Sequence, residues 1–367
     1  MLEPPRIFKD KKDAPANAKV IDAFSSSLTE LFFIAHPHLK KGMPEVDAEL
    51  QKYLEANTIP DIWIYYPETN TLVRTLPEEE YFRLRTARNR DLISEQEQNN
   101  FRSITVGIAG LSVGSSVLNI LVLSGGPKVL KIADFDTLEV SNLNRIRAGL
   151  ADVGTNKTEI AAREVWELDP FAQLKLYHDG LNKENIEEFI LGEPRLGVFV
   201  DAMDSIDLKI LARLICKKNK IPVLSATDNG DSVILDIERF DLEPGREIFH
   251  GLVKDIEQLD LDHLDYKSWL NLAAQIVGPE YLTESMQDSV LKIGKSLASV
   301  PQLGASAAIG GSACSFAIRR IANKQALNSG RSIISLEEKL IPGFGDPESV
   351  LSRSTKTEQF VRSFGQK

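Results

Sequence analysis

Cysteine is scarce in this chain of 367 residues, which has only Cys216 and Cys314. Two cysteines cannot form the framework of several bridges that stabilises small secreted domains, and low cysteine use is typical of a reducing compartment. The N-terminus shows no charged-then-apolar leader of the secretory type. We therefore expect a cytoplasmic protein.

Long apolar runs and an excess of positive charge are also missing. The best candidate for a membrane span is 300–318, but it is rich in Gly, Ser and Ala and contains Gln302, which favours a tightly packed internal helix. Lys and Arg number 43 against 53 Asp and Glu, giving a formal net charge of −10. Because a nucleic-acid surface needs a concentrated basic patch, the sequence predicts neither a membrane nor a nucleic-acid partner.

The sequence predicts a small N-terminal α+β domain over residues 1–84. Leu28, Leu31, Phe32 and Ile34 have helical spacing. Residues 61–74 predict a hairpin, because two β-rich runs flank the turn-forming cluster Pro-Glu-Thr-Asn. A charged helical stretch follows over 78–98.

From residue 104 the pattern changes to alternating strands and helices. Strands are expected at 104–109, 129–133, 174–177, 198–200 and 222–224, and helices at 113–123, 157–168, 184–190 and 207–218. This alternation predicts an α/β fold with a doubly wound, mostly parallel Rossmann-like sheet over 85–245. The alternating stretch 232–239 predicts an edge or antiparallel strand. A helical C-terminal part is expected over 246–330, and a polar tail over 331–367.

The stretch TVGIAGLSVGSSV at 105–117 has two interpretations. Gly110-Leu-Ser112-Val-Gly114 has the G-x-S-x-G spacing of a hydrolase nucleophile elbow, and His178, His250 and His263 follow as possible partners. The stretch is also a strand, a glycine turn and a helix, which is how a phosphate-binding loop begins. An elbow at the first strand is atypical and leaves the polar residues downstream unexplained, so a phosphate loop is favoured.

Those polar residues follow the predicted strands, where a doubly wound sheet binds its ligands. Asp134 ends the second strand in a position to bond a ribose hydroxyl, and Asp136 comes two residues later. The basic stretch 141–147 and Lys157 come next, and charge of this kind suits a triphosphate better than a dinucleotide. Asp201 and Asp204 end a further strand, and hard oxygen ligands at a phosphate site suit Mg²⁺.

The segments AGLSVGSS, ADFDTLEVSNLNR, GTNK and VDAMDS, in this order, resemble the ThiF/MoeB/HesA adenylyltransferases, relatives of the adenylating domain of ubiquitin-activating enzymes. The resemblance covers about 85–241, and RNRDLI at 88–93 resembles the family's stretch before the first strand. It implies an ATP- and Mg²⁺-dependent enzyme that activates a carboxylate as an acyl-adenylate. It also implies a homodimer.

The resemblance implies a role for each matching residue. By this resemblance the glycine turn (Gly110, Ser112, Gly114) would contact phosphate, and Asp134 would bind ribose with Asp136 nearby. The phosphates would be held by Asn142, Arg145 and Lys157. Asp204 would position Mg²⁺, and Arg90 would enter the other subunit's site. Arg90, Arg145, Lys157 and Asp204 would be the catalytic residues. The activated carboxylate would belong to a ubiquitin-like or sulfur-carrier protein, a peptide, or a small or tRNA-borne acid, of which the acidic surface disfavours tRNA.

The chain also departs from the family's pattern. Its glycine loop is shorter than the usual G-x-G-G-x-G, and two cysteines cannot supply the four thiolates of the family's structural zinc. No cysteine lies between 225 and 313, where thioester-forming relatives carry one, so the second nucleophile should be external. Two alternatives stay open: an NAD(P)- or FAD-binding oxidoreductase, and a nucleotide-binding scaffold without turnover.

Overall fold

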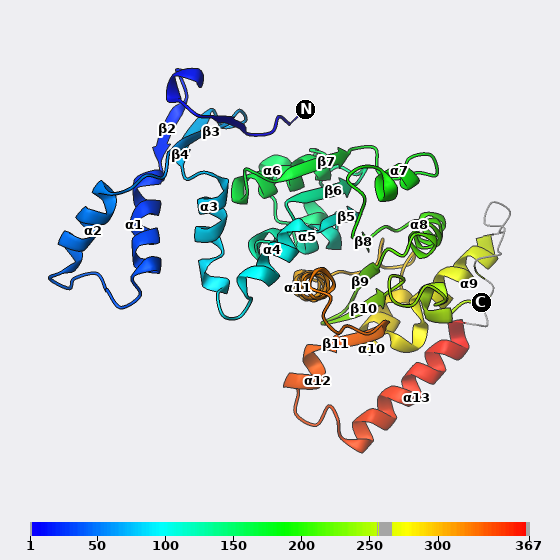
Figure 1. Ribbon diagram of the computed structural model, residues 1–367. Coiled ribbons are helices and arrows are strands. Elements are labelled where there is room, and N and C mark those ends of the chain that lie inside the picture. The colour runs from blue at the N-terminus through cyan, green and yellow to red at the C-terminus, as the bar shows by residue number, and fades with distance from the viewer. Residues whose placement is uncertain (1, 255, 257–265, 365–367) are drawn as a thin grey trace. The chain divides into compact units, whose positions relative to one another are not determined.

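The computed structural model describes residues 2–254, 256 and 266–364, and its chain divides into two compact units (Figure 1). The N-terminal unit comprises Met1–Asn99 and Arg163–Ala172, and the second unit comprises Asn100–Ala162 and Gln173–Lys367. This division lies after residue 99, whereas the sequence placed a domain boundary at 84. It also groups the short segment 163–172 with the N-terminal unit.

The N-terminal unit contains a four-stranded sheet in the order β1-β3-β4-β2. The expected hairpin is present as β3 (Ile62–Tyr66) and β4 (Thr71–Thr75), while β1 (Arg6–Phe8) pairs antiparallel with β3 and β2 (Lys19–Asp22) pairs parallel with β4. The helices are α1 (Phe24–Ala35), α2 (Val46–Glu55) and α3 (Glu78–Arg85). Phe24, Leu28 and Leu31 of α1 pack with Leu76 in one apolar core.

The charged stretch 78–98 is not one helix as expected. It forms α3 and then α4 (Glu95–Ser103), with a short 3-10 turn at Ala87–Asn89 between them. Asp91 in the interruption has φ of 69°, a left-handed conformation that cannot continue a helix. The spacing of hydrophobic residues gave no indication of this break in the helix. Because of the break, Arg90 lies on an exposed turn.

The second unit is built on a seven-stranded sheet in the order β11-β10-β9-β8-β5-β6-β7. The five strands from β9 to β7 are parallel, and β10 and β11 add antiparallel at one edge. The bounds are β5 (Thr105–Ala109), β6 (Val129–Ala133), β7 (Gln173–Tyr177), β8 (Val198–Asp201), β9 (Val223–Asn229), β10 (Ser232–Glu238) and β11 (Gly330–Ser335). The predicted doubly wound, mostly parallel sheet is confirmed. From β5 the chain adds β6 and β7 on one side and then β8 and β9 on the other, so the strand order of the sheet reverses between β5 and β8.

Helices cover both faces of this sheet. Val223 and Ala226 lie three apart on β9 and therefore face opposite sides; Val223 packs in the core of α7 and α8, whereas Ala226 faces α11. The helices are α5 (Val113–Leu123), α6 (Lys157–Leu168), α7 (Ile186–Leu191), α8 (Ile206–Lys218) and α11 (Gly304–Ala322). In Figure 1, α11 runs beside α5.

Most of the segment 300–318 lies in α11, which begins at Gly304 and is the tightly packed internal helix that its small residues predicted. A Cβ on Gly311 would lie 2.6 Å from the Ser116 carbonyl oxygen of α5, so only glycine permits this approach. Within the described part of the chain, no helix is both long and apolar enough to cross a membrane.

The C-terminal region is helical over much of 246–330, with α9 (Tyr266–Val277) and α10 (Glu284–Val290) before α11. The stretch expected as a polar tail begins with β11, which pairs along the outer edge of β10. It is followed by α12 (Leu336–Leu340) and α13 (Pro347–Phe364). An edge strand has one open side, which is compatible with the polar composition of this stretch.

Candidate nucleotide-binding site

The glycine turn lies at the reversal of the strand order, where β5 leads into α5. Gly110 has φ of 87°, and a Cβ there would lie 2.1 Å from the Ala202 carbonyl oxygen, so glycine is required. A Cβ on Gly114 would lie 2.9 Å from Cγ2 of Ile108, so this glycine lets α5 pack on β5. The turn therefore sits in the crevice where doubly wound sheets bind nucleotides.

Asp134 connects this turn to the end of β6 through hydrogen bonds. Its Oδ2 accepts a hydrogen bond from the Leu111 amide at 2.6 Å, and its Oδ1 accepts one from the Asp136 amide at 2.8 Å. Burial raises the pKa of Asp134, while these amides and Lys157 oppose the rise. The predicted contact of Asp134 with ribose stays a prediction.

Lys157 is the first residue of α6, and its Nζ donates to Oδ2 of Asp136 at 2.7 Å. The lysine side chain is buried, whereas that of Asp136 is half exposed. The pair brings one of the two predicted phosphate-binding cations to the end of β6.

Arg145, the other predicted cation, is held against the glycine turn. Its Nε donates to Oγ of Ser112 at 2.8 Å, and its Nη1 donates to Oδ1 of Asn144 at 2.8 Å and to the Ser141 carbonyl at 3.2 Å. Burial lowers the pKa of Arg145, and the nearby carboxylates of Asp228 and Asp204 oppose the shift. This contact places Arg145 at the glycine turn, and its predicted contact with phosphate stays a prediction.

The partner of Ser112 also decides against the hydrolase interpretation. The Ser112 hydroxyl binds Arg145, and not a histidine. His178 contacts Oγ1 of Thr158 and His250 contacts Asp236, while His263 lies outside the described residues. A serine nucleophile needs a general base within hydrogen-bonding distance. His178 and His250 form their hydrogen bonds with other residues, so neither is placed as the base for Ser112.

Asn142 has a structural role in the loop that carries Arg145. It is buried, and its Oδ1 accepts a hydrogen bond from the Glu139 amide at 3.0 Å, which caps a short 3-10 helix (Val140–Asn142). Its predicted contact with phosphate stays a prediction.

The two acids after β8 have different environments. Asp201 is fully buried and paired with Lys209 at 3.1 Å and with Arg213, so the expectation that it lies at the open rim is wrong. Burial alone would raise the pKa of Asp201, but these two cations lower it. Asp204 is exposed, and its predicted contact with Mg²⁺ stays a prediction.

Arg90 lies in the N-terminal unit, and the other predicted site residues lie in the second unit. It is exposed at the end of the 3-10 turn Ala87–Asn89. Its predicted action in a second subunit stays a prediction.

Both cysteines are buried, free thiols. Burial raises the pKa of each thiol, that of Cys314 to about 12. A thioester requires an accessible thiolate, so neither side chain suits that chemistry.

The sequence profile of the ThiF family matches residues 86–278, more than half of the chain. The chain belongs to the ThiF family. The match spans the glycine turn, the loop of Arg145, the start of α6 and the residues after β8.

Three curated relatives show how far the similarity extends. The chain is 33% identical over 90% of its length to "Uncharacterized protein MT1398" of Mycobacterium tuberculosis, and spans 44% of that protein. It is 33% identical over 36% of its length to tRNA threonylcarbamoyladenosine dehydratase 2 of Saccharomyces cerevisiae, spanning 30% of it. Molybdopterin-synthase adenylyltransferase of Haemophilus influenzae is 24% identical over 56% of the chain and 82% of the relative. The chain thus spans less than half of the first two relatives.

The fold of this ThiF-family chain also matches solved structures. The microcin C7 biosynthetic enzyme MccB, in complex with N-formylated MccA, superposes with a TM-score of 0.50 at 16% identity, covering 85% of this chain and 84% of MccB. At this identity the likeness concerns the fold alone.

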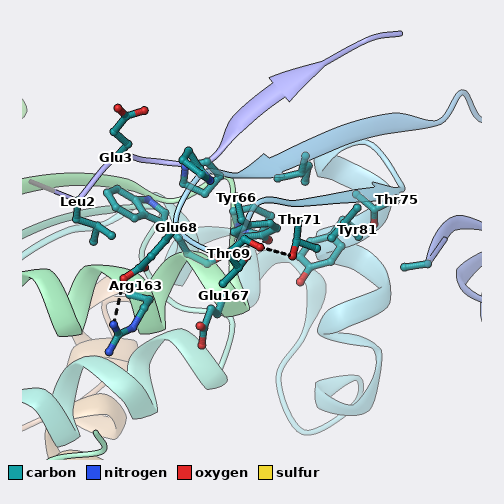
Figure 2. Close-up of a pocket in the computed structure, with 17 residues that line it drawn as sticks. Leu2, Glu3, Tyr66, Glu68, Thr69, Thr71, Thr75, Tyr81, Arg163 and Glu167 are labelled. Carbon is teal, nitrogen blue, oxygen red and sulfur yellow. Dashed lines mark hydrogen bonds and ion pairs between the residues drawn. The ribbon is translucent and has the colours of Figure 1, made fainter. Parts of the chain in front are cut away.

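Outside the glycine-turn region, the N-terminal unit contains a cavity of about 370 Å³ (Figure 2). Tyr66, Tyr81 and Trp166 line it, and their polar groups are engaged by backbone carbonyls: Tyr66 by that of Trp166, Tyr81 by that of Leu168 and Trp166 by that of Ala172. The sequence analysis had assigned Tyr66 to packing of the small sheet. It gave no sign of the cavity, because Arg163–Ala172 joins this unit only in the folded chain.

Proposed function

We propose that the protein is an ATP- and Mg²⁺-dependent adenylyltransferase that activates a carboxylate as an acyl-adenylate. The observation that carries the proposal is the contact of Arg145 with the glycine turn at the strand-order reversal, with Lys157 at the end of the adjacent strand. A dinucleotide dehydrogenase has no need of two cations there, one of them buried. An enzyme that separates the phosphates of ATP does, because negative charge develops on the departing pyrophosphate.

The residues at this crevice fit ATP and Mg²⁺. The glycine turn lets backbone amides at the start of α5 approach phosphate, and exposed Asp204 and half-exposed Asp136 offer hard oxygen ligands. When bound, Mg²⁺ neutralises phosphate charge. An oxygen of the substrate carboxylate bonds to the α-phosphorus while the bond from that phosphorus to the bridging oxygen breaks, releasing pyrophosphate. Arg145 and Lys157 then hold the leaving group.

We also propose that the enzyme is a homodimer. Three apolar side chains on the segments around Asp136 and Lys157 are largely exposed: Phe135 at 71%, Val140 at 61% and Leu150 at 72%. Apolar exposure of this kind marks association surfaces. A second copy would cover these side chains and supply its Arg90, the one predicted site residue located in the other unit.

The substrate we propose is the carboxyl end of a peptide or of a ubiquitin-like or sulfur-carrier protein, in the cytoplasm. Support comes from the adenylyltransferase among the relatives and from the acidic composition, which is unfavourable for binding tRNA. Because both thiols are buried, the nucleophile that receives the activated acyl group is external.

ATP with Mg²⁺ is expected to raise the melting temperature, because a ligand that binds only the native state stabilises it. At a hundredfold excess over Kd the gain is about 2.7 kcal/mol, or roughly 5 °C. A thermal-shift screen of ATP·Mg²⁺, NAD⁺ and FAD at equal concentration measures it. Stabilisation by NAD⁺ with no effect of ATP would establish the oxidoreductase alternative instead.

A further inference from the structure

Asp228 is a buried carboxylate that no sequence motif had singled out. It lies near the end of β9, the strand next to β8, and is only 6% exposed. Among the residues that the structure describes, neither of its carboxylate oxygens has a hydrogen-bond partner. The hydroxyl of nearby Ser306 donates instead to the Leu303 carbonyl at 2.8 Å. A buried carboxylate without a donor is costly, and such groups call for an explanation.

Other buried acids of the same sheet are satisfied. Asp236 and Glu238 on β10 bind Arg331 at 2.7 Å and Arg213 at 2.7 Å, respectively. Burial raises the pKa of Asp228 to about 6 in spite of nearby Ser306 and Arg145, whereas His250 and Arg331 hold the pKa of Asp236 far below its usual range although burial opposes them. Asp228 therefore differs from acids that hold the sheet together.

The surroundings of Asp228 belong to the candidate nucleotide site. Its charge acts on Arg145, and Ser306 beside it lies in the first turn of α11. That helix starts against the Arg145 loop, because a Cβ on Gly304 would lie 2.4 Å from the Asn144 carbonyl oxygen and Asn144 Nδ2 donates to the Gln302 carbonyl at 2.8 Å. No side chain of the described residues caps the start of α11.

This arrangement places groups of two kinds side by side. Arg145 and the free amides of α11 suit a carboxylate, and Asp228 lacks a hydrogen-bond donor. The guanidinium and the positive end of the helix dipole disfavour a second positive charge beside Asp228, so a neutral N–H suits it better than an ammonium or a metal ion.

We propose that Asp228 accepts a hydrogen bond from the N–H on the carbon next to the substrate's carboxylate, which identifies the substrate as the carboxyl-terminal residue of a peptide chain. The inference rests on the proposed adenylation. Arg145 and the start of α11 receive the carboxylate before the reaction, and Asp228 holds the neighbouring peptide N–H before and after it. Asp228 thus selects α-amido acids over simple organic acids.

Two stable analogues of the acyl-adenylate test this assignment: 5′-O-(N-acylsulfamoyl)adenosine with an N-acetylglycyl or a 4-oxopentanoyl group. They have the same number of heavy atoms, and the second has CH₂ in place of N–H. Isothermal titration calorimetry with the full chain should show at least about tenfold tighter binding of the first, as expected for a hydrogen bond to a charged acceptor. In Asp228→Ala the two affinities should agree within about twofold, with the affinity for AMP unchanged.

Equal affinities for the wild type would overturn the inference while leaving adenylation intact. If neither analogue binds although ATP·Mg²⁺ raises the melting temperature, adenylation itself is wrong and the inference falls with it. Urea unfolding distinguishes a role of Asp228 in substrate binding from a role in the stability of the fold. If the role is in binding, Asp228→Ala should be at least as stable as the wild type, because the substitution removes an unsatisfied carboxylate. A marked loss of stability in that variant would show that the carboxylate serves the fold and not a substrate.

Discussion

Arg145→Ala is expected to lower ATP-dependent AMP formation about 10²- to 10³-fold, the range seen when one preorganised electrostatic group is removed. Arg145 is the cation that contacts the glycine turn directly, so its loss leaves the charge on the departing pyrophosphate without its partner. Rapid-quench measurement of AMP at saturating ATP reports the rate. A parallel titration of ATP binding separates this loss from weaker binding.

Ser112→Ala is the matched control, because Ser112 accepts the Nε hydrogen bond of Arg145. Asn144 and Ser141 still hold the guanidinium in this variant, so the loss should stay within about tenfold. If Ser112→Ala removed activity completely while Arg145→Ala kept it, Ser112 would be a nucleophile and the phosphate-loop interpretation would be wrong.

Arg90→Ala is expected to lower turnover by the order of 10³-fold, the effect of an arginine that stabilises a phosphoryl-transfer transition state. Arg90 is exposed and lies in a different unit from Arg145 and Lys157, as a residue working in a neighbouring subunit would. Arg88→Ala is a control for the same turn, since Arg88 is also exposed and lies two residues away. Its activity should stay within about twofold of the wild type, as for most surface substitutions.

Mixing of inactive chains shows whether Arg90 works in trans. A two-fold dimer of one Arg90→Ala chain and one Lys157→Ala chain has one site in which both groups are intact. Free subunit exchange makes half of the dimers mixed, so about a quarter of all sites, and of the wild-type activity, should return. Heterodimers that form and remain inactive would show that Arg90 acts within its own chain or not at all.

Local sequence patterns were sufficient for the parts of the fold that repeat. Periodicity placed α5 and β6 at their observed bounds, and glycine chemistry located the turn at Gly110, where φ is positive and no side chain fits. Arg145, which the sequence had proposed as a phosphate-binding residue, lies on a separate loop and donates a hydrogen bond to Ser112 of this turn. These features depend on residues close together in the sequence and on the rule that a doubly wound sheet binds its ligands at the carboxyl ends of its strands.

Features decided by distant contacts could not be predicted in this way. Asp201 and Asp204 are the same residue type three positions apart, yet only tertiary packing of Arg213 buries one of them. Asp228 has no motif, and its importance rests on a carboxylate that has no hydrogen-bond partner among the described residues. The pairing of β11 with β10 and the cavity beside Trp166 likewise join segments far apart in the sequence.

The products formed from ATP test the central claim most directly. The wild type would be incubated with ATP·Mg²⁺, hydroxylamine and a pool of peptides and organic acids, and the nucleotides would be quantified by chromatography and the hydroxamates by mass spectrometry. Adenylation predicts AMP and pyrophosphate in equal amounts, with acyl hydroxamates formed by trapping, and a signal that Arg145→Ala largely removes. Formation of ADP and phosphate, or AMP no higher than in the Arg145→Ala control, would contradict the account.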